Sequence, residues 1–198
     1  QTLFLVLVYK FLEIAHNYVF YQFLLKHYCL LIVSLCLIYL FQKKNNLLEA
    51  LSGIDVQLKM RLDLIPNMLK TASKYMEHEK KIFDEVAKVR ESVLNASNYN
   101  DKFKAENKLS EAISVFNARA EAYPELKSDK AMNKAQDALL DVEEHIAAAR
   151  RFYNSAVKEY KNALEIFPSS LIASMLGLTD DYPFFEAEEK AREAIDVD

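Results

Sequence analysis

Charged side chains are distributed very unevenly along this chain. Residues 1–41 contain three of them, Lys10, Glu13 and Lys26, whereas the rest of the chain carries nearly all of the 25 basic and 29 acidic residues. An apolar leader therefore precedes a strongly polar body. Only two glycines and four prolines interrupt the sequence, and sandwiches, barrels and Rossmann-type sheets need more tight turns than that. The sequence predicts an all-α fold built from long helices.

The leader contains a candidate membrane span. Residues 28–41 (YCLLIVSLCLIYLF) carry no charge, but fourteen residues in a helix cover only about 21 Å of a hydrocarbon core about 30 Å thick. Extending the segment back to Tyr18 gives a length that can cross, with Lys26 reaching the interface through its aliphatic stem. Tyr39 and Phe41 then lie in the aromatic belt at the other end. We therefore predict a transmembrane helix over residues 18–41.

A cleaved signal peptide is the main alternative to a retained span. Lys43 and Lys44 follow the apolar run where a small-residue cleavage site is expected, which favours a retained, single-pass anchor. Residues 1–17 form a second apolar patch, too short to cross and compatible with a helix in the interface. Basic residues after the span favour the body on the cytoplasm-equivalent side.

The polar body, residues 42–167, is predicted to be a helical bundle. Apolar residues recur in steps of three and four from Leu48 to Leu69, which indicates an amphipathic helix. Pro66 is expected to kink or restart this helix. Further helices are expected over residues 70–94, 101–122 and 128–167. They pack as an antiparallel four-helix bundle, or as three helices with one kinked at Pro66.

Residues 168–198 comprise an apolar segment and an acidic tail. The stretch 167–178 (FPSSLIASMLGL) has no charge, and in an up-down-up-down bundle it returns to the membrane-proximal end. We expect it to pack onto the membrane surface or the exit of the span, with Leu171, Ile172, Met175 and Leu176 as contacting residues. A hydrophobic plug under the bundle is the alternative.

Several strings give the chain a resemblance to the LemA family. "IDVQL" stands at 54–58 and "DLIPN" at 63–67, followed by AYPELK at 122–127, AAARRFYNSAVKEY at 147–160, FPSSLIA at 167–173 and FFEAEE at 184–189. The resemblance implies a short N-terminal segment, one membrane span and a helical domain facing the cytoplasm. It implies no reaction.

Polar residues within these strings are the candidate site. They are Asp55, Arg61, Asp63, Asn67, Arg150, Arg151 and Asn154. A charge on or beside an apolar stripe needs a partner, so we predict that Asp55 or Asp63 pairs with Arg150 or Arg151. A ligand or metal site built from these residues is the alternative. We also expect the Asn67 amide to donate to the Leu62 carbonyl, which Pro66 deprives of its usual donor.

Other chemistry has little support in the sequence. Asp141 and His145 are four residues apart, a spacing typical of a surface pair. The two Glu-His clusters, at residues 77–79 (EHE) and 143–145 (EEH), both lack the Glu-x-x-His spacing of di-iron bundles. Gly-rich phosphate loops and nucleophile elbows are absent from the sequence, so we predict no catalytic activity, cofactor or metal. The acidic body, without a basic block, argues against nucleic acid.

These observations favour a membrane-anchored scaffold or interaction protein. Its expected partners are the lipid membrane and a protein, with self-association as one form. Two alternatives stay open: an accessory subunit of a larger membrane complex, organellar membranes included, and a membrane-bound sensor or enzyme that uses the polar residues named above.

Overall fold

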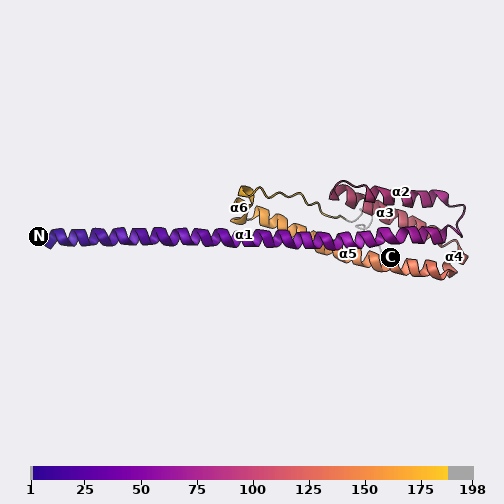
Figure 1. Ribbon diagram of the computed structural model, residues 1–198, viewed down its shortest axis with the longest axis horizontal. Helices are drawn as coiled ribbons and strands as arrows, with labels where there is room; N and C mark the ends of the chain where they lie inside the picture. Colours follow the sequence, from indigo (N-terminus) through magenta and orange to yellow (C-terminus); the bar gives the residue numbers. More distant parts are fainter. Residues whose placement is uncertain (1, 187–198) are drawn as a thin grey trace, which may run out of the picture. The chain divides into compact units, whose positions relative to one another are not determined.

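The computed structural model describes residues 2–186 and contains six α-helices and no strand in that part of the chain. The helices are α1 (Thr2–Ala72), α2 (Lys80–Leu94), α3 (Tyr99–Ala120), α4 (Pro124–Ser128), α5 (Lys130–Glu165) and α6 (Ser169–Met175) (Figure 1). The predicted all-α fold is confirmed. The acidic residues of the tail beyond Glu186 lie outside the described residues.

Two compact units make up the chain. The first contains α1 up to Lys44 together with Tyr160–Asp180, and the second contains Asn45–Glu159 together with the described residues from Asp181 onward. Each unit has its own buried apolar contacts.

In the first unit, α1 is solvent-exposed along most of the predicted span. The aromatic and aliphatic side chains from Phe20 to Leu35 lie mainly on the surface. Contacts begin at Cys36, Leu37 and Leu40, which pack against the end of α5 and against α6 through Ala163, Leu164, Ile172, Ala173 and Leu178. Of the helices in the described part of the chain, α1 is the one whose length and composition suit a membrane crossing.

Gly177 ends α6 and turns the chain back toward α1. Its φ of 63° is the left-handed conformation that favours glycine. The Leu178 N–H donates to the Ala173 carbonyl at 3.0 Å and the Gly177 N–H to the Ser174 carbonyl at 3.2 Å, which is the hydrogen-bond pattern of a Schellman motif. Leu178 consequently joins the same apolar cluster as Ala173.

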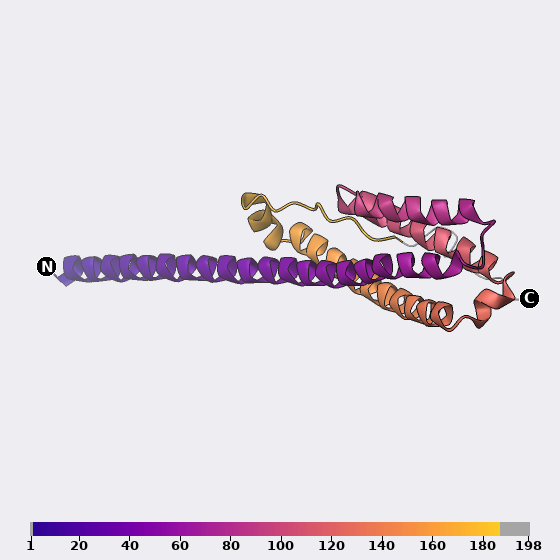
Figure 2. The same ribbon diagram turned by 45° about the vertical axis from the view of Figure 1, so that its right-hand side comes forward.

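The second unit is an antiparallel four-helix bundle. Its helices are the part of α1 from Asn45 to Ala72, α2, α3 and α5, with α2 and α3 side by side (Figures 1 and 2). The core is formed by residues at helical spacing on each inward face, including Leu62, Ile65 and Met68 of α1, Val86, Val89 and Val93 of α2, Leu109, Ile113 and Phe116 of α3, and Leu139 of α5.

The predicted apolar stripes are largely the buried ones. On α1, Leu51, Ile54, Leu58, Leu62 and Ile65 are all buried. At the start of that stripe, however, Leu47 is buried and Leu48 is 42% exposed. The expected helix over residues 70–94 begins only at Lys80, because residues 73–79 form the turn that reverses the chain.

Two acidic side chains stabilise the turns at the end of the bundle where α1 stops. The carboxylate of Asp129 accepts hydrogen bonds from the backbone N–H groups of Ala131 and Met132, at the start of α5, and from the Tyr75 hydroxyl at 2.7 Å. Glu79 accepts from Arg119 at 2.6 Å and from the Tyr123 hydroxyl at 2.9 Å. The turn after α1 is thereby bonded to the ends of α3 and α4.

Pro66 lies inside α1 without ending it, so the prediction of a restart there is wrong. Proline at this position leaves the Leu62 carbonyl without its usual donor. Arg90 of α2 supplies the replacement, because its Nε donates to the Leu62 oxygen at 2.9 Å. Asn67, expected in this role, is instead exposed. A donor from a neighbouring helix therefore compensates for the proline.

Replacing Arg90 with alanine should lower the free energy of unfolding by about 1–2 kcal/mol, because the half-buried Leu62 carbonyl then lacks a donor. Alanine at position 66 would restore the helix's own N–H at that place. The cost of Arg90→Ala should therefore shrink in a Pro66→Ala background, as measured by denaturant unfolding in mild detergent. Equal costs in the two backgrounds would contradict this account.

Candidate functional site

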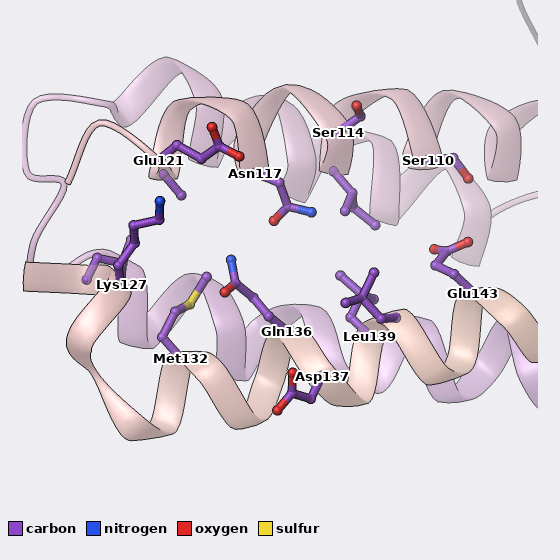
Figure 3. A pocket seen from close by; sticks show the side chains of 14 residues that line it. Ser110, Ser114, Asn117, Glu121, Lys127, Met132, Gln136, Asp137, Leu139 and Glu143 are labelled. Atoms are coloured by element: carbon purple, nitrogen blue, oxygen red, sulfur yellow. The ribbon is translucent and has the colours of Figure 1, made fainter. Parts of the chain in front are cut away.

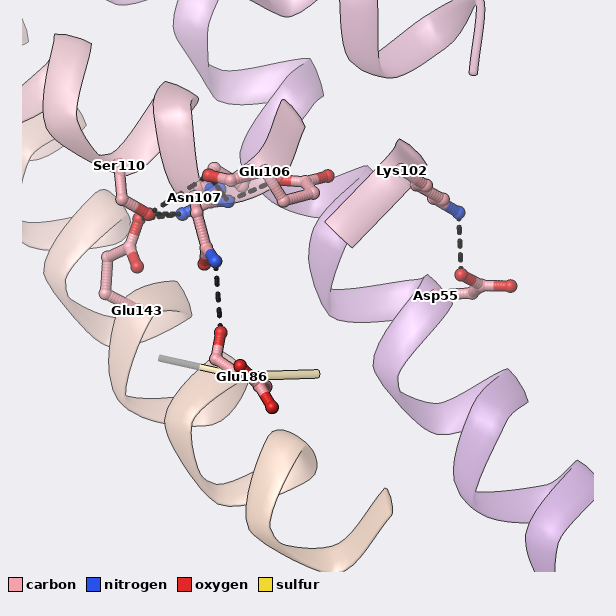
Figure 4. A network of polar contacts seen from close by, with 8 residues as sticks. Asp55, Lys102, Glu106, Asn107, Ser110, Glu143 and Glu186 are labelled. Carbon is pink, nitrogen blue, oxygen red and sulfur yellow. Dashed lines mark hydrogen bonds and ion pairs between the residues drawn. The ribbon is translucent and has the colours of Figure 1, made fainter. Parts of the chain in front are cut away.

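Arg61 is the centre of a buried polar network that joins three helices. Its side chain, on α1, is 1% exposed, and that of Glu106, on α3, is fully buried. The guanidinium donates to both the carboxylate and the backbone carbonyl of Glu106, to the Ser110 hydroxyl at 2.7 Å, and to Glu143 of α5 at 2.8 Å. Figure 4 shows Glu106, Ser110 and Glu143 converging on this point. The network therefore connects α1, α3 and α5.

The network has one cation for two carboxylates. Burial alone lowers the pKa of the Arg61 guanidinium, but the charges of Glu106 and Glu143 outweigh it and raise that pKa above its ordinary value. For Glu106 the balance is opposite: burial raises the pKa of its carboxyl, and the Arg61 charge offsets only part of that rise. Because two carboxylates share Arg61, the protonated form of Arg61 is favoured, whereas the ionised form of Glu106 is disfavoured.

The expected pairing of Asp55 or Asp63 with Arg150 or Arg151 is wrong. Asp55 pairs with Lys102 of α3 at 2.6 Å and accepts from the Tyr99 hydroxyl at 3.2 Å (Figure 4). Asp63 forms an exposed pair with Lys59 one turn away, at 3.1 Å. The arginines lie farther along α5, and Arg151 is exposed. Of the predicted charged residues, Arg61 and Asp55 bridge helices, but they do so with partners outside the predicted set.

Asn154 binds the backbone of an extended C-terminal segment. Its amide donates to the Phe185 carbonyl at 2.9 Å and accepts from the Phe185 N–H at 2.8 Å. Nearby, the Tyr153 hydroxyl donates to the Pro183 carbonyl at 2.8 Å, and Asn107 donates to the Glu186 carbonyl at 3.0 Å (Figure 4). Side chains of α3 and α5 thus satisfy the polar groups of a segment that has no regular secondary structure.

The Phe185 side chain anchors this segment. It is 2% exposed and stacks on Phe103 of α3, with ring centroids 4.3 Å apart and planes 4° from parallel. The Arg150 guanidinium lies 5.7 Å from the centre of the Phe185 ring. Arg150 and Asn154, both predicted site residues, therefore contact the C-terminal segment rather than an acidic residue of α1.

A cavity of about 510 Å³ lies between α3 and α5, beside the Arg61 network. Its lining includes Ser110 and Glu143 at one end, and Glu121 and Lys127 are also among its lining residues. In Figure 3 the amide of Asn117, from α3, and that of Gln136, from α5, point toward each other across the opening. The Oδ1 atom of Asn117 is buried and has no hydrogen-bond partner among the described residues.

Glu106 and Phe185 were missed at the sequence level. Glu106 lies three residues after Phe103 and three before Leu109, so it is a charged residue on the inward face of α3, and this spacing could have identified it. Phe185 stands in the string FFEAEE at 184–189, but that segment has no helical periodicity from which its burial could be predicted. Asp141 and His145 form the expected surface pair, 3.7 Å apart. Among the side chains that the structure describes, acidic, histidine and cysteine residues form no group suited to hold a metal.

Among the membrane-contacting candidates, α6 presents two different faces. Ile172 is buried with Leu40 of α1, so it contacts the exit of the predicted span, one of the two contacts expected for this segment, and not the membrane surface. Leu171, Met175 and Leu176 are exposed, Met175 to 80%. On α1, Lys26 and Phe41 are exposed, and the Lys43 ammonium lies 5.6 Å from the centre of the Tyr39 ring. Both elements therefore place apolar surface near the C-terminal end of the predicted span.

The network makes a prediction about pH. Because the pKa of Glu106 is raised in the folded state, the protonated carboxyl favours folding, and this contribution is lost as pH rises above the ordinary value of 4.5. Glutamine at position 106 removes the titration. The free energy of unfolding of Glu106→Gln minus that of the wild type should therefore increase as pH rises from 4.5 to neutrality, in denaturant titrations.

The exposed Glu144 provides the control, since Glu144→Gln changes the net charge by the same amount. A difference between Glu106→Gln and the wild type that does not change with pH would contradict the assignment.

Comparison with known proteins identifies the family. The model of the LemA family matches residues 50–198, about three quarters of the chain, including the bundle, α6 and the segment that holds Phe185. A search of curated protein sequences found no match. The strings at residues 54–58, 63–67 and 147–160 all lie within the matched region. The chain belongs to the LemA family.

Proposed function

We propose that this chain is a membrane-anchored helical scaffold that binds a protein partner and has no catalytic activity. The observation that carries the proposal is the extent of α1, which is a single helix from Thr2 to Ala72. One helix thus contains both the apolar span of residues 18–41, mainly exposed from Phe20 to Leu35, and the first helix of the bundle. An exposed apolar helix is stable in lipid, because its backbone N–H and C=O groups are hydrogen-bonded to one another within the helix.

The buried charges support a structural role for the bundle. Arg61 bonds to both Glu106 and Glu143 across three helices, and the partly buried Asp55 bonds to Lys102. Charge-assisted hydrogen bonds between helices restrict how far the helices can shift against one another. A rigid bundle on a membrane anchor suits the presentation of a binding surface.

A second membrane contact, through α6, is part of the proposal. The helix packs through Ile172 and Ala173 against Leu40 of α1, at the end of the predicted span. Its other side leaves Leu171, Met175 and Leu176 exposed, together with the neighbouring Phe167. Burial of a large apolar side chain contributes about 1.5–3 kcal/mol. A membrane surface at this end of the span would cover these side chains.

Tryptophan fluorescence can test both membrane contacts. The chain contains no tryptophan, so Leu30→Trp, Met175→Trp and Val115→Trp each introduce one reporter at an exposed position. In vesicles of lipids brominated along the acyl chain, Leu30→Trp should be strongly quenched and Met175→Trp partly quenched. Val115→Trp, on α3, should keep its emission and serves as the control.

An unquenched Leu30→Trp would overturn the proposed anchor. Quenching of Leu30→Trp without quenching of Met175→Trp would leave the anchor in place and overturn the contact through α6.

A further inference from the structure

The facing sides of α3 and α5, here called the groove, hold the C-terminal segment toward one end and line the cavity toward the other. On α3 the residues facing it are Phe103, Asn107, Ser110, Ser114, Asn117 and Glu121; on α5 they are Asn154, Arg150, Glu143, Gln136 and Met132. Within each helix these positions follow steps of three or four residues or their multiples, so they lie on one helix face. The groove therefore extends from Phe103 and Asn154, past Ser110 and Glu143, to the cavity at Asn117 and Gln136.

The chain's own C-terminal segment occupies the first half of this groove. There, the amide of Asn154 forms two hydrogen bonds with the backbone of Phe185, and Asn107 binds the Glu186 carbonyl. Side-chain amides are suited to this role because each carries both a donor and an acceptor, like a peptide group. This half shows directly how the groove holds an extended peptide.

The second half has the same chemistry. Asn117 and Gln136 direct their amides toward each other over the opening (Figure 3). The Asn117 carbonyl oxygen is buried without a partner among the described residues, and such an acceptor is costly unless a donor binds to it. Beneath the amides the lining is apolar, with Ile113, Met132 and Leu139 buried. A rotation of the Asn117 amide would turn this oxygen toward the cavity, where a peptide N–H can donate to it. An apolar side chain would fill the cavity of about 510 Å³.

The charges of the cavity indicate which peptide fits. Its lining contains the acidic residues Glu121, Asp137 and Glu143 and one cation, Lys127. Arg61 already pairs with Glu143, which leaves two acidic side chains to one basic side chain. Electrostatic complementarity therefore favours a basic segment over an acidic one. The chain's own last residues, 187–198 (AEEKAREAIDVD), contain more acidic than basic side chains. The charge pattern therefore favours a segment of another protein over the chain's own residues 187–198 as the occupant of the cavity.

We propose that the cavity between α3 and α5 binds an extended segment of a partner protein, with an apolar side chain flanked by basic residues. The segment's backbone bonds to the amides of Asn117 and Gln136, and its apolar side chain lies over Ile113 and Leu139. The proposal rests on the interaction role proposed above and names the chemistry of the partner.

Capped peptides can test this site on the full chain in neutral phosphatidylcholine nanodiscs, which do not attract basic peptides. The probe is acetyl-Lys-Ala-Leu-Ala-Lys-amide, and its acidic counterpart has both lysines replaced by glutamate. Titrations followed by the side-chain amide NMR signals of Asn117 and Gln136 should show saturable binding of the basic probe and weaker binding of the acidic one.

Matched variants separate the site from general effects. Asn117→Leu and Gln136→Ala should each weaken binding about tenfold, since each removes hydrogen bonds to the peptide backbone. Gln57→Leu is the control, because Gln57 also has a buried, unpartnered carbonyl oxygen but does not line the cavity. It should leave the affinity unchanged. Two variants are used because either one alone could perturb folding, which circular dichroism detects.

Three outcomes would overturn the proposal. The first is that the basic probe shows no saturable binding; the second is that it binds the Asn117→Leu and Gln136→Ala variants as tightly as it binds the wild type; the third is that it binds only after residues 187–198 are removed. The last outcome would assign the cavity to the chain's own end. None of them affects the tryptophan quenching experiment, so failure of this site can be distinguished from failure of the membrane anchor.

Discussion

The bundle depends on the placement of one buried cation, Arg61. Its guanidinium is bonded at the same time to Glu106, Ser110 and Glu143, and a shift of α1 by one residue along its neighbours would leave a charge unpaired in the core. An unpaired buried ion costs several kcal/mol. The network therefore fixes the register of α1 against α3 and α5. Hydrophobic contacts alone would tolerate such shifts better, because they are not directional.

The same arrangement connects the features that we consider functional. Glu143 belongs to the Arg61 network and also lines the cavity between α3 and α5. Toward Asn154 lie Asn107, about one turn from Ser110 on α3, and Arg150, about two turns from Glu143 on α5, and both contact the C-terminal segment. A partner bound in the cavity would therefore approach both the network and the segment held by Asn154.

Helical periodicity allowed much of the fold to be predicted from the sequence. The apolar stripe from Leu51 to Ile65 is buried as expected, since an amphipathic helix has few other ways to hide that face. Side-chain partners could not be predicted in the same way. Asp55 bonds to Lys102 and Arg90 bonds to the Leu62 carbonyl. Both pairings depend on how the neighbouring helices are rotated about their axes and shifted along them. Phe185 was missed because its burial comes from a groove that exists only after α3 and α5 have packed.

A double-mutant cycle between Arg61 and Glu106 tests the central role of the buried cation most directly. Arg61→Leu leaves the Glu106 carboxyl buried without its cation and should cost about 3–5 kcal/mol of unfolding free energy. Combining it with Glu106→Leu removes both charges, so the double variant should recover a large part of that loss, measured by denaturant unfolding of the full chain in detergent. Additive costs, or a cost of Arg61→Leu below about 1 kcal/mol, would contradict a register fixed by Arg61.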